Sequence, residues 1–105
     1  MTTAVVLQAL GEPHRVAILE LLRDGERPVG ELVDELHQSQ PAVSKHLRVL
    51  RDAGLVEVRP DGQRRLYRIR PEPLEELDAW FAAYRSLWSR HLDRLEDHLA
   101  QRRDG

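Results

Sequence analysis

Polar and basic side chains are concentrated between Ser39 and Arg48, in a segment whose helical wheel has one apolar face. Val43, Leu47 and Leu50 fall within about 60° of one another at about 100° per residue, so they form the expected buried stripe of a helix over residues 40–53. The opposite face is small, polar and basic, which suits hydrogen bonding to base edges and phosphates in a DNA major groove. The candidate contact residues on this helix are Ser39, Gln40, Pro41, Ser44, Lys45 and Arg48.

A second group of candidate contacts follows a predicted turn. Pro60-Asp61-Gly62 has turn chemistry, because proline holds φ near one value and glycine accepts positive φ. Apolar residues alternate with charged ones on both sides of it, which predicts a β-hairpin. The expected tip of the hairpin carries Gln63, Arg64 and Arg65, whose side chains suit contacts in or beside a minor groove.

The charge of the chain is strongly segregated, although its formal net value is only −2. Residues 39–70 contain 8 basic and 3 acidic side chains, or 8 − 3 = +5, and the remaining residues contain 8 basic and 15 acidic ones, or 8 − 15 = −7. Such a block neutralises several phosphates while the acidic flanks are repelled by the duplex. The alternative is an ordinary solvated surface, for which segregation is not required.

Catalytic chemistry is not indicated by the spacing of the reactive residues. No glycine-rich phosphate loop or nucleophile elbow is present, and the five histidines are spread over different predicted elements. Ser44 and His46 lie two positions apart on one helix and face different directions, so they cannot pair as nucleophile and base. We therefore expect no enzyme activity.

Metal chemistry is limited by the absence of cysteine, which excludes thiolate sites and thiol redox sensing. His91 and His98 share a helix face but lie about 10.5 Å apart along the axis at about 1.5 Å per residue, too far for one ion within one helix. They remain weak candidates for a site shared between two chains, the alternative being histidines at a helical interface or its solvent edge. We expect no metal and no cofactor.

The length of 105 residues predicts a single domain, residues 1–105, with one modest core. The longest apolar run, residues 79–84, is far shorter than the roughly 20 residues of a membrane span. No lysine or arginine precedes Arg15, so a secretory signal is not indicated. We expect no membrane association and a cytoplasmic location.

The remaining pattern predicts helices over residues 3–10, 13–25 and 31–36 before the polar helix, and one long helix from Leu74 to about Gln101, preceded by the strand-ending Pro71 and Pro73. The apolar positions of the long helix alternate steps of three and four residues, a pattern typical of a seam for another helix. A homodimer is therefore expected, with interface residues Val6, Leu10, Leu77, Phe81, Tyr84, Trp88, Leu92 and Leu95.

This order of elements resembles that of winged helix-turn-helix proteins, and more narrowly the ArsR-type (arsenical-resistance repressor-like) transcriptional regulators. The resemblance covers about residues 5–70. It is carried most specifically by the segment Ser39–Leu47 and by the Ala-Gly-Leu-Val of residues 53–56. The single positions that support it are Leu10, Arg15, Ile18, Leu19, Leu32, Leu36, Leu50, Gly62, Arg64 and Tyr67.

The resemblance implies a mainly α fold of order α-α-α-α-β-β-α. Its helix-turn-helix lies at about residues 29–53, its wing at about 55–70 and its long C-terminal dimerisation helix at about 72–102. It also implies a homodimeric repressor that leaves an inverted-repeat operator when a signal arrives, with dimerisation through the first and last helices. The chain lacks the cysteine, Asp-x-His and His-x-x-Glu or His-x-x-His metal motifs of metal-sensing members.

The favoured hypothesis is a DNA-binding regulator. In it Gln40, Ser44 and Lys45 reach base edges, and Ser39 and Arg48 bind phosphates. Two alternatives stay open: an interaction module that does not bind DNA, and a repressor that responds to a metal held between chains. An effector pocket along the aromatic residues of the long helix is a third, weaker idea, since aromatics at this spacing usually pack in a core or seam. The effector itself is unknown.

Overall fold

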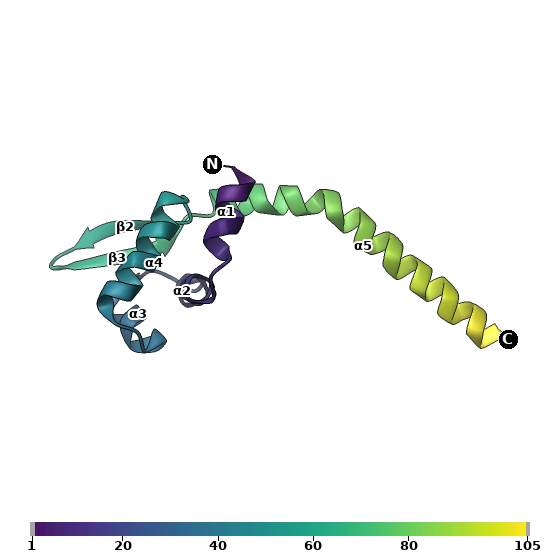
Figure 1. Ribbon diagram of the computed structural model, residues 1–105, viewed down its shortest axis with the longest axis horizontal. Helices are drawn as coiled ribbons and strands as arrows, with labels where there is room; N and C mark the ends of the chain where they lie inside the picture. The colour runs from purple at the N-terminus through teal and green to yellow at the C-terminus, as the bar shows by residue number, and fades with distance from the viewer. Residues whose placement is uncertain (1, 105) are drawn as a thin grey trace.

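The computed structural model describes residues 2–104 (Figure 1). The elements, in chain order, are α1 (Thr3–Leu10), α2 (Pro13–Leu22), β1 (Arg27–Pro28), α3 (Val29–Leu36), α4 (Gln40–Asp52), β2 (Val56–Asp61), β3 (Arg64–Ile69) and α5 (Glu72–Asp104). Figure 1 shows α1 to α4 and the hairpin gathered into one body, from which α5 extends as an arm. The molecule measures 69 × 28 × 20 Å as a result.

Local capping explains how the first two helices begin and how they are joined. The Thr2 hydroxyl accepts a hydrogen bond from the backbone N–H of Val5, and the Glu12 carboxylate accepts one from that of Arg15. The Arg15 guanidinium donates to the backbone carbonyls of Ala9, at 2.5 Å, and Gln8, at 3.3 Å. These carbonyls lie at the open C-terminal end of α1, so Arg15 both caps α1 and fixes it against α2.

A tight turn joins α3 to α4. His37 ends α3 in the left-handed conformation, with φ 54°, which reverses the chain direction at the cost of a conformation that non-glycine residues adopt less often. Ser39 then caps α4, where its hydroxyl accepts from the backbone N–H of Ala42 at 3.3 Å. Pro41 stands in the first turn, where its missing N–H leaves no hydrogen bond unmade. The predicted helix-turn-helix is confirmed.

The core lies between α2, α3, α4 and the hairpin. Val43, Leu47 and Leu50, the stripe predicted from the helical wheel, are at most 1% exposed. They pack with buried residues of the neighbouring elements, which include Ile18, Leu22, Leu32, Leu55 and Val56. Burial of this stripe fixes the rotation of α4 about its axis and turns its polar side outward.

The sheet has three strands in the order β1-β3-β2, all antiparallel, where the sequence predicted only the β2–β3 hairpin. Arg27 pairs with Tyr67 and Pro28 with Leu66, so the two-residue β1 is added along β3. A strand this short has no readable period, and only tertiary pairing makes it one.

The hairpin turn is shorter than the sequence suggested. Pro60 and Asp61 belong to β2 and pair with Arg65 and Arg64, so the chain reverses over Gly62, whose φ is 63°, and Gln63. Arg64 and Arg65 therefore lie at the start of β3 and not in the turn itself.

The long helix begins at Glu72, before the Leu74 start that the residue pattern predicted, because Pro73 occupies its first turn and does not precede the helix. It comprises 33 residues, and every residue whose side chain is described from Asp78 onward is exposed. Its first turns pack against α1. No helix among residues 2–104 combines the length and the apolar composition needed to cross a membrane.

Two residues expected at a dimer interface are instead part of the chain's own core. Val6 is 1% exposed and Leu77 is 9% exposed, and both belong to the buried cluster, against which Leu10 also packs. The helical period could not separate these positions from the rest of the seam, because an intramolecular and an intermolecular contact require the same apolar spacing.

Candidate nucleic-acid interface

The outward face of α4 carries all of the candidate contacts predicted for it. Gln40, Pro41, Ser44, Lys45 and Arg48 are all exposed. Pro41, Lys45 and Arg48 lie opposite the buried stripe, and Ser44 lies at its border. Ser39, at the N-cap, is exposed as well. The helix N-terminus adds a partial positive charge at the end where these side chains are gathered.

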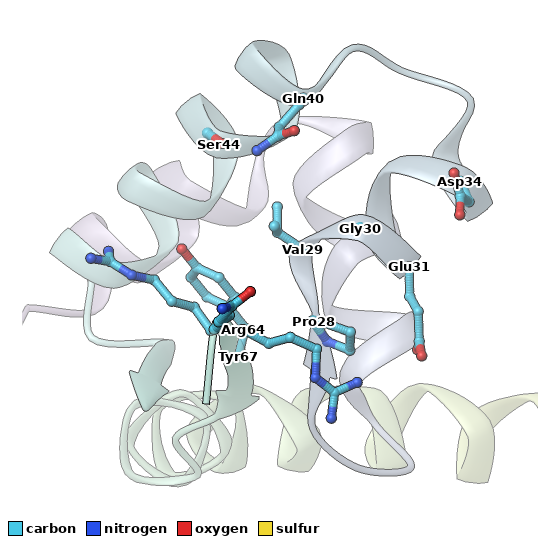
Figure 2. A pocket seen from close by; sticks show the side chains of 11 residues that line it. Pro28, Val29, Gly30, Glu31, Asp34, Gln40, Ser44, Arg64 and Tyr67 are labelled. Carbon is cyan, nitrogen blue, oxygen red and sulfur yellow. The ribbon is translucent and has the colours of Figure 1, made fainter. Parts of the chain in front are cut away.

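A groove of about 720 Å³ joins this face to the wing (Figure 2). From α4 it is lined by Gln40 and Ser44, and from the hairpin by Gln63, Arg64 and Arg65. The two groups of candidate contacts, which lie about twenty residues apart in the sequence, thus border one concave surface. Its other wall is the start of α3, from Pro28 to Glu31, with Asp34.

Tyr67 also lines this groove and was not among the predicted site residues. It follows Arg65 by two positions on β3, so the alternation of a strand places both on the same face. That period was the signal that identified the strand, and it would have identified Tyr67 too. The acidic Glu31 and Asp34 carry no comparable signal, because their approach to the groove depends on how α3 packs.

The basic block is partly neutralised within the fold. Arg59 donates two hydrogen bonds to Glu26, Arg68 pairs with Glu57, and Arg64 lies 3.0 Å from Asp61. The Arg59 hydrogen bonds lower the pKa of the Glu26 carboxyl below its usual value, although burial acts in the opposite direction. Such local pairs reduce the charge offered to an external phosphate.

Four cations of the block make no ion pair with any residue whose side chain is described. They are Lys45, Arg48, Arg51 and Arg65. Lys45 and Arg48 stand on the outward face of α4, and Arg65 stands in the groove. The charge available to a ligand is therefore concentrated at the predicted contact surface.

The cap at Ser39 supports a stability prediction. We expect Ser39→Ala to lower the free energy of unfolding by about 1 kcal/mol, because the amide of Ala42 loses its side-chain acceptor. Urea denaturation followed by circular dichroism measures this. The matched control is Ser44→Ala, an exposed serine inside the same helix, for which a small stabilisation of up to about 0.5 kcal/mol is expected because alanine is the better helix former. Equal effects of the two substitutions would show that the cap contributes nothing.

The sequence suggested that the five histidines lie apart on different elements, but two of them are in contact in the structure. His91 and His98 are exposed on α5, and no group of three metal-ligating side chains within the described part of the chain includes either. His14 and His46, in contrast, stack with ring centroids 5.6 Å apart and lie beside Glu12. The helical spacing predicted neither contact, because α2 and α4 are brought together only by the core.

An exposed apolar face continues along α5. Trp80 packs edge-on against Phe81, at 5.0 Å between ring centroids, and at a tilt against Tyr84, at 4.8 Å. The exposed large apolar side chains of this helix are Trp80, Phe81, Tyr84, Leu87, Trp88, Leu92, Leu95 and Leu99. They include every predicted interface residue beyond Leu77.

Comparison with known proteins identifies similar chains. The model of the family described as bacterial regulatory protein, arsR family, matches residues 12–58. The chain is 48% identical over 64 residues to the HTH-type transcriptional repressor SmtB of Mycobacterium tuberculosis, a match that covers 61% of this chain and 47% of SmtB. It is 50% identical over 70 residues to the HTH-type transcriptional regulator Rv2034 of the same organism, covering 67% of this chain and 65% of that one. The matched region thus spans about half to two-thirds of the length of these relatives.

A solved structure extends the similarity to most of the chain. The crystal structure of an ArsR family transcriptional regulator superposes with a TM-score of 0.74 at 32% sequence identity, and the match covers 82% of this chain and 94% of that one. The mainly helical, winged architecture with its long last helix is therefore shared with a protein of related sequence.

Proposed function

This chain belongs to the ArsR family of bacterial regulatory proteins, and we propose that it is a repressor that binds double-stranded DNA. The observation that carries the proposal is the groove in which the polar end of α4 meets the wing. Arg65 lines this groove and makes no ion pair with a described side chain. We also propose that it acts in the cytoplasm, the compartment that holds bacterial DNA.

In this proposal α4 enters the major groove with its N-terminal end first. Gln40, Ser44 and Lys45 reach base edges, since amide and ammonium groups distinguish base pairs there. Ser39 and Arg48 bind the flanking phosphates. Pro41 supports the close approach of the backbone, and the wing places Gln63, Arg64 and Arg65 in or beside the minor groove.

The active form is proposed to be a homodimer formed through α5. The apolar face that runs from Phe81 to Leu95 has no cover within the described chain, and burying it supplies the hydrophobic stabilisation of an interface. A twofold dimer carries two α4 helices, which read an inverted repeat. From α1, we propose that the exposed Val5 and Leu7 contribute to this interface, because Val6 is buried in the core of its own chain.

Base and backbone contacts are expected to separate on mutation. Gln40→Ala and Lys45→Ala should each weaken operator binding by about 1 to 3 kcal/mol and relax the preference at particular base pairs. Arg65→Ala should weaken all duplexes alike and reduce the slope of log affinity against log salt by about 1, because one phosphate fewer is neutralised. The measurement is fluorescence anisotropy with a selected operator and a scrambled duplex at several salt concentrations.

The matched control is Arg68→Ala on the same strand. Arg68 is exposed like Arg65 but pairs with Glu57 and does not line the groove, so little change is expected. An equal loss of affinity from both substitutions would indicate attraction by net charge alone. Two results together would contradict the proposal: selection from a random DNA library that enriches no inverted repeat, and DNA binding that does not weaken as salt rises. They would favour the alternative of an interaction module that does not bind DNA.

A further inference from the structure

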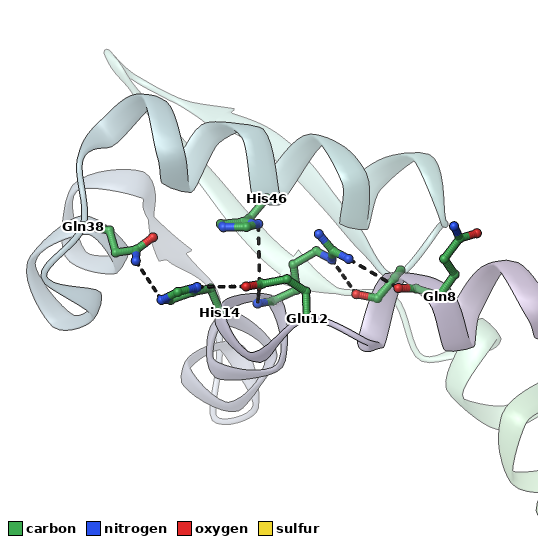
Figure 3. A network of polar contacts seen from close by, with 7 residues as sticks. Gln8, Glu12, His14, Gln38 and His46 are labelled. Atoms are coloured by element: carbon green, nitrogen blue, oxygen red, sulfur yellow. Dashed lines mark hydrogen bonds and ion pairs between the residues drawn. The ribbon is translucent and has the colours of Figure 1, made fainter.

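Two imidazoles and one carboxylate meet where α2 packs against α4 (Figure 3). Glu12 caps α2, His14 lies in the first turn of that helix, and His46 stands in the middle of α4. One ligand atom of each side chain lies within 4.8 Å of the others. Nδ1 of His14 is 2.9 Å from one Glu12 oxygen, and Nδ1 of His46 is 3.8 Å from the other.

The His46 side chain has an unsatisfied ring nitrogen in this cluster. The side chain is 17% exposed, and its Nδ1 atom is buried without a hydrogen-bond partner among the described residues. The 3.8 Å separation from Glu12 is too long for a hydrogen bond. A buried nitrogen with no partner is destabilising, and it is aimed at a carboxylate with space between them.

His14 and Glu12 are within hydrogen-bond distance, whereas His46 and Glu12 are not, and one shared cation would satisfy all three side chains. Metal–ligand bonds of about 2.0 to 2.2 Å in tetrahedral geometry place neighbouring ligand atoms about 3.4 Å apart. The present separations, from 2.9 Å to within 4.8 Å, bracket that value, so rotamer adjustments of about an ångström bring the three atoms onto one ion.

Glu12 is charged at neutral pH, as a ligand must be. Burial raises the pKa of its carboxyl, but hydrogen bonds from His14 and from the backbone N–H of Arg15 hold it below the usual value. The carboxylate therefore competes for the cation in its ionised form.

Gln38 supplies the outer support that histidine ligands require. Its side-chain amide nitrogen lies 2.7 Å from Nε2 of His14. When a cation occupies Nδ1, Nε2 carries the proton, and a half-turn of the Gln38 amide presents its oxygen as acceptor. The amide thus orients the imidazole in the bound state as well.

We propose that Glu12, His14 and His46 form a binding site for a divalent cation of the Zn²⁺ type, with a fourth position open to water. Imidazole and carboxylate donors without thiolate favour Zn²⁺, Ni²⁺ or Co²⁺ over soft cations. The site replaces the weaker idea of a site at His91 or His98. The inference goes beyond the proposed function, because the site would bind the cation whether or not DNA is bound. A bound ion links α2 to the helix that carries Lys45.

Calorimetric titration of Zn²⁺ into the untagged 105-residue chain tests the site. One ion per chain is expected, together with a rise in the thermal unfolding temperature. Glu12→Gln, His14→Gln and His46→Gln should each weaken binding more than tenfold, and Gln38→Ala should weaken it about tenfold while leaving all three ligands in place. Titration with Co²⁺ provides an absorption spectrum that reports nitrogen and oxygen ligands in tetrahedral geometry.

His91→Gln and His98→Gln are the matched controls and should leave the affinity unchanged. Circular dichroism checks that each variant is folded. If a ligand variant does not fold, Gln38→Ala still tests the site, because it leaves all three ligands in place. Binding that survives His46→Gln and Gln38→Ala, or that is abolished only in the two α5 variants, overturns the proposal. Both outcomes are read without DNA, so they are independent of operator binding.

Discussion

The double variant Trp88→Glu, Leu92→Glu is expected to be a folded monomer whose affinity for an inverted-repeat operator is at least about a hundredfold lower than that of the parent chain. Trp88 is 67% exposed and Leu92 is 44% exposed, so neither side chain supports the core of its own chain. In the proposed dimer, four carboxylates would be buried in an apolar seam, which opposes association. A monomer reaches one half-site and loses the gain from joining two recognition helices.

The measurement pairs sedimentation at micromolar concentration with fluorescence anisotropy on the operator. The matched control is Ala83→Glu, Ser86→Glu, which adds the same charge to exposed positions about 180° around α5, at about 100° per residue. The control should remain dimeric and keep its affinity. If the parent chain is already monomeric, or if the double variant remains dimeric, then α5 does not form the dimer interface.

Leu50→Ala is expected to lower the free energy of unfolding by about 2 to 5 kcal/mol. The Leu50 side chain is 0% exposed and lies in the stripe that fixes α4 against α2 and α3, so its truncation leaves a cavity in a small core. Domains of this size are stable by only about 5 to 15 kcal/mol, so the loss is a large part of the total. Operator binding should fall with the folded fraction.

Urea denaturation at one fixed protein concentration measures this change, because dimer stability depends on concentration. Arg51→Ala is the control, since Arg51 is the next residue of α4, is exposed and makes no ion pair with a described side chain. It should change the free energy by no more than about 0.5 kcal/mol. If Leu50→Ala lowers the free energy of unfolding by less than about 1 kcal/mol, then this stripe does not fix the orientation of the outward face of α4.

Features that depend on residues close together in the sequence were predicted correctly, and features that depend on distant residues were missed. The buried stripe Val43, Leu47 and Leu50 was predicted correctly because a helical wheel depends on residues a few positions apart. The hairpin was predicted for the same reason, with its turn placed two residues too early at Pro60 and Asp61. The strand β1 was missed, because two residues carry no period and pair only when β3 lies beside them.

Electrostatic predictions needed the tertiary structure. The sequence counted eight basic residues in the block, but Arg59 is paired with Glu26, which is 33 positions away. The count therefore overstated the charge that is available to an external ligand. Lys45, Arg48 and Arg65 make no ion pair with a described side chain, and this depends on which acidic side chains the fold brings near.

The sequence by itself determined the types of all elements except β1, the face of α4 that is exposed and the apolar seam of α5, because local periodicity and turn chemistry act within one element. Only the tertiary structure decided that α4 and the wing share one groove, that Val6 and Leu77 belong to the core, and that His14 and His46 meet beside Glu12. These outcomes depend on residues far apart in the chain, which are brought together when the core closes and not by any spacing along it.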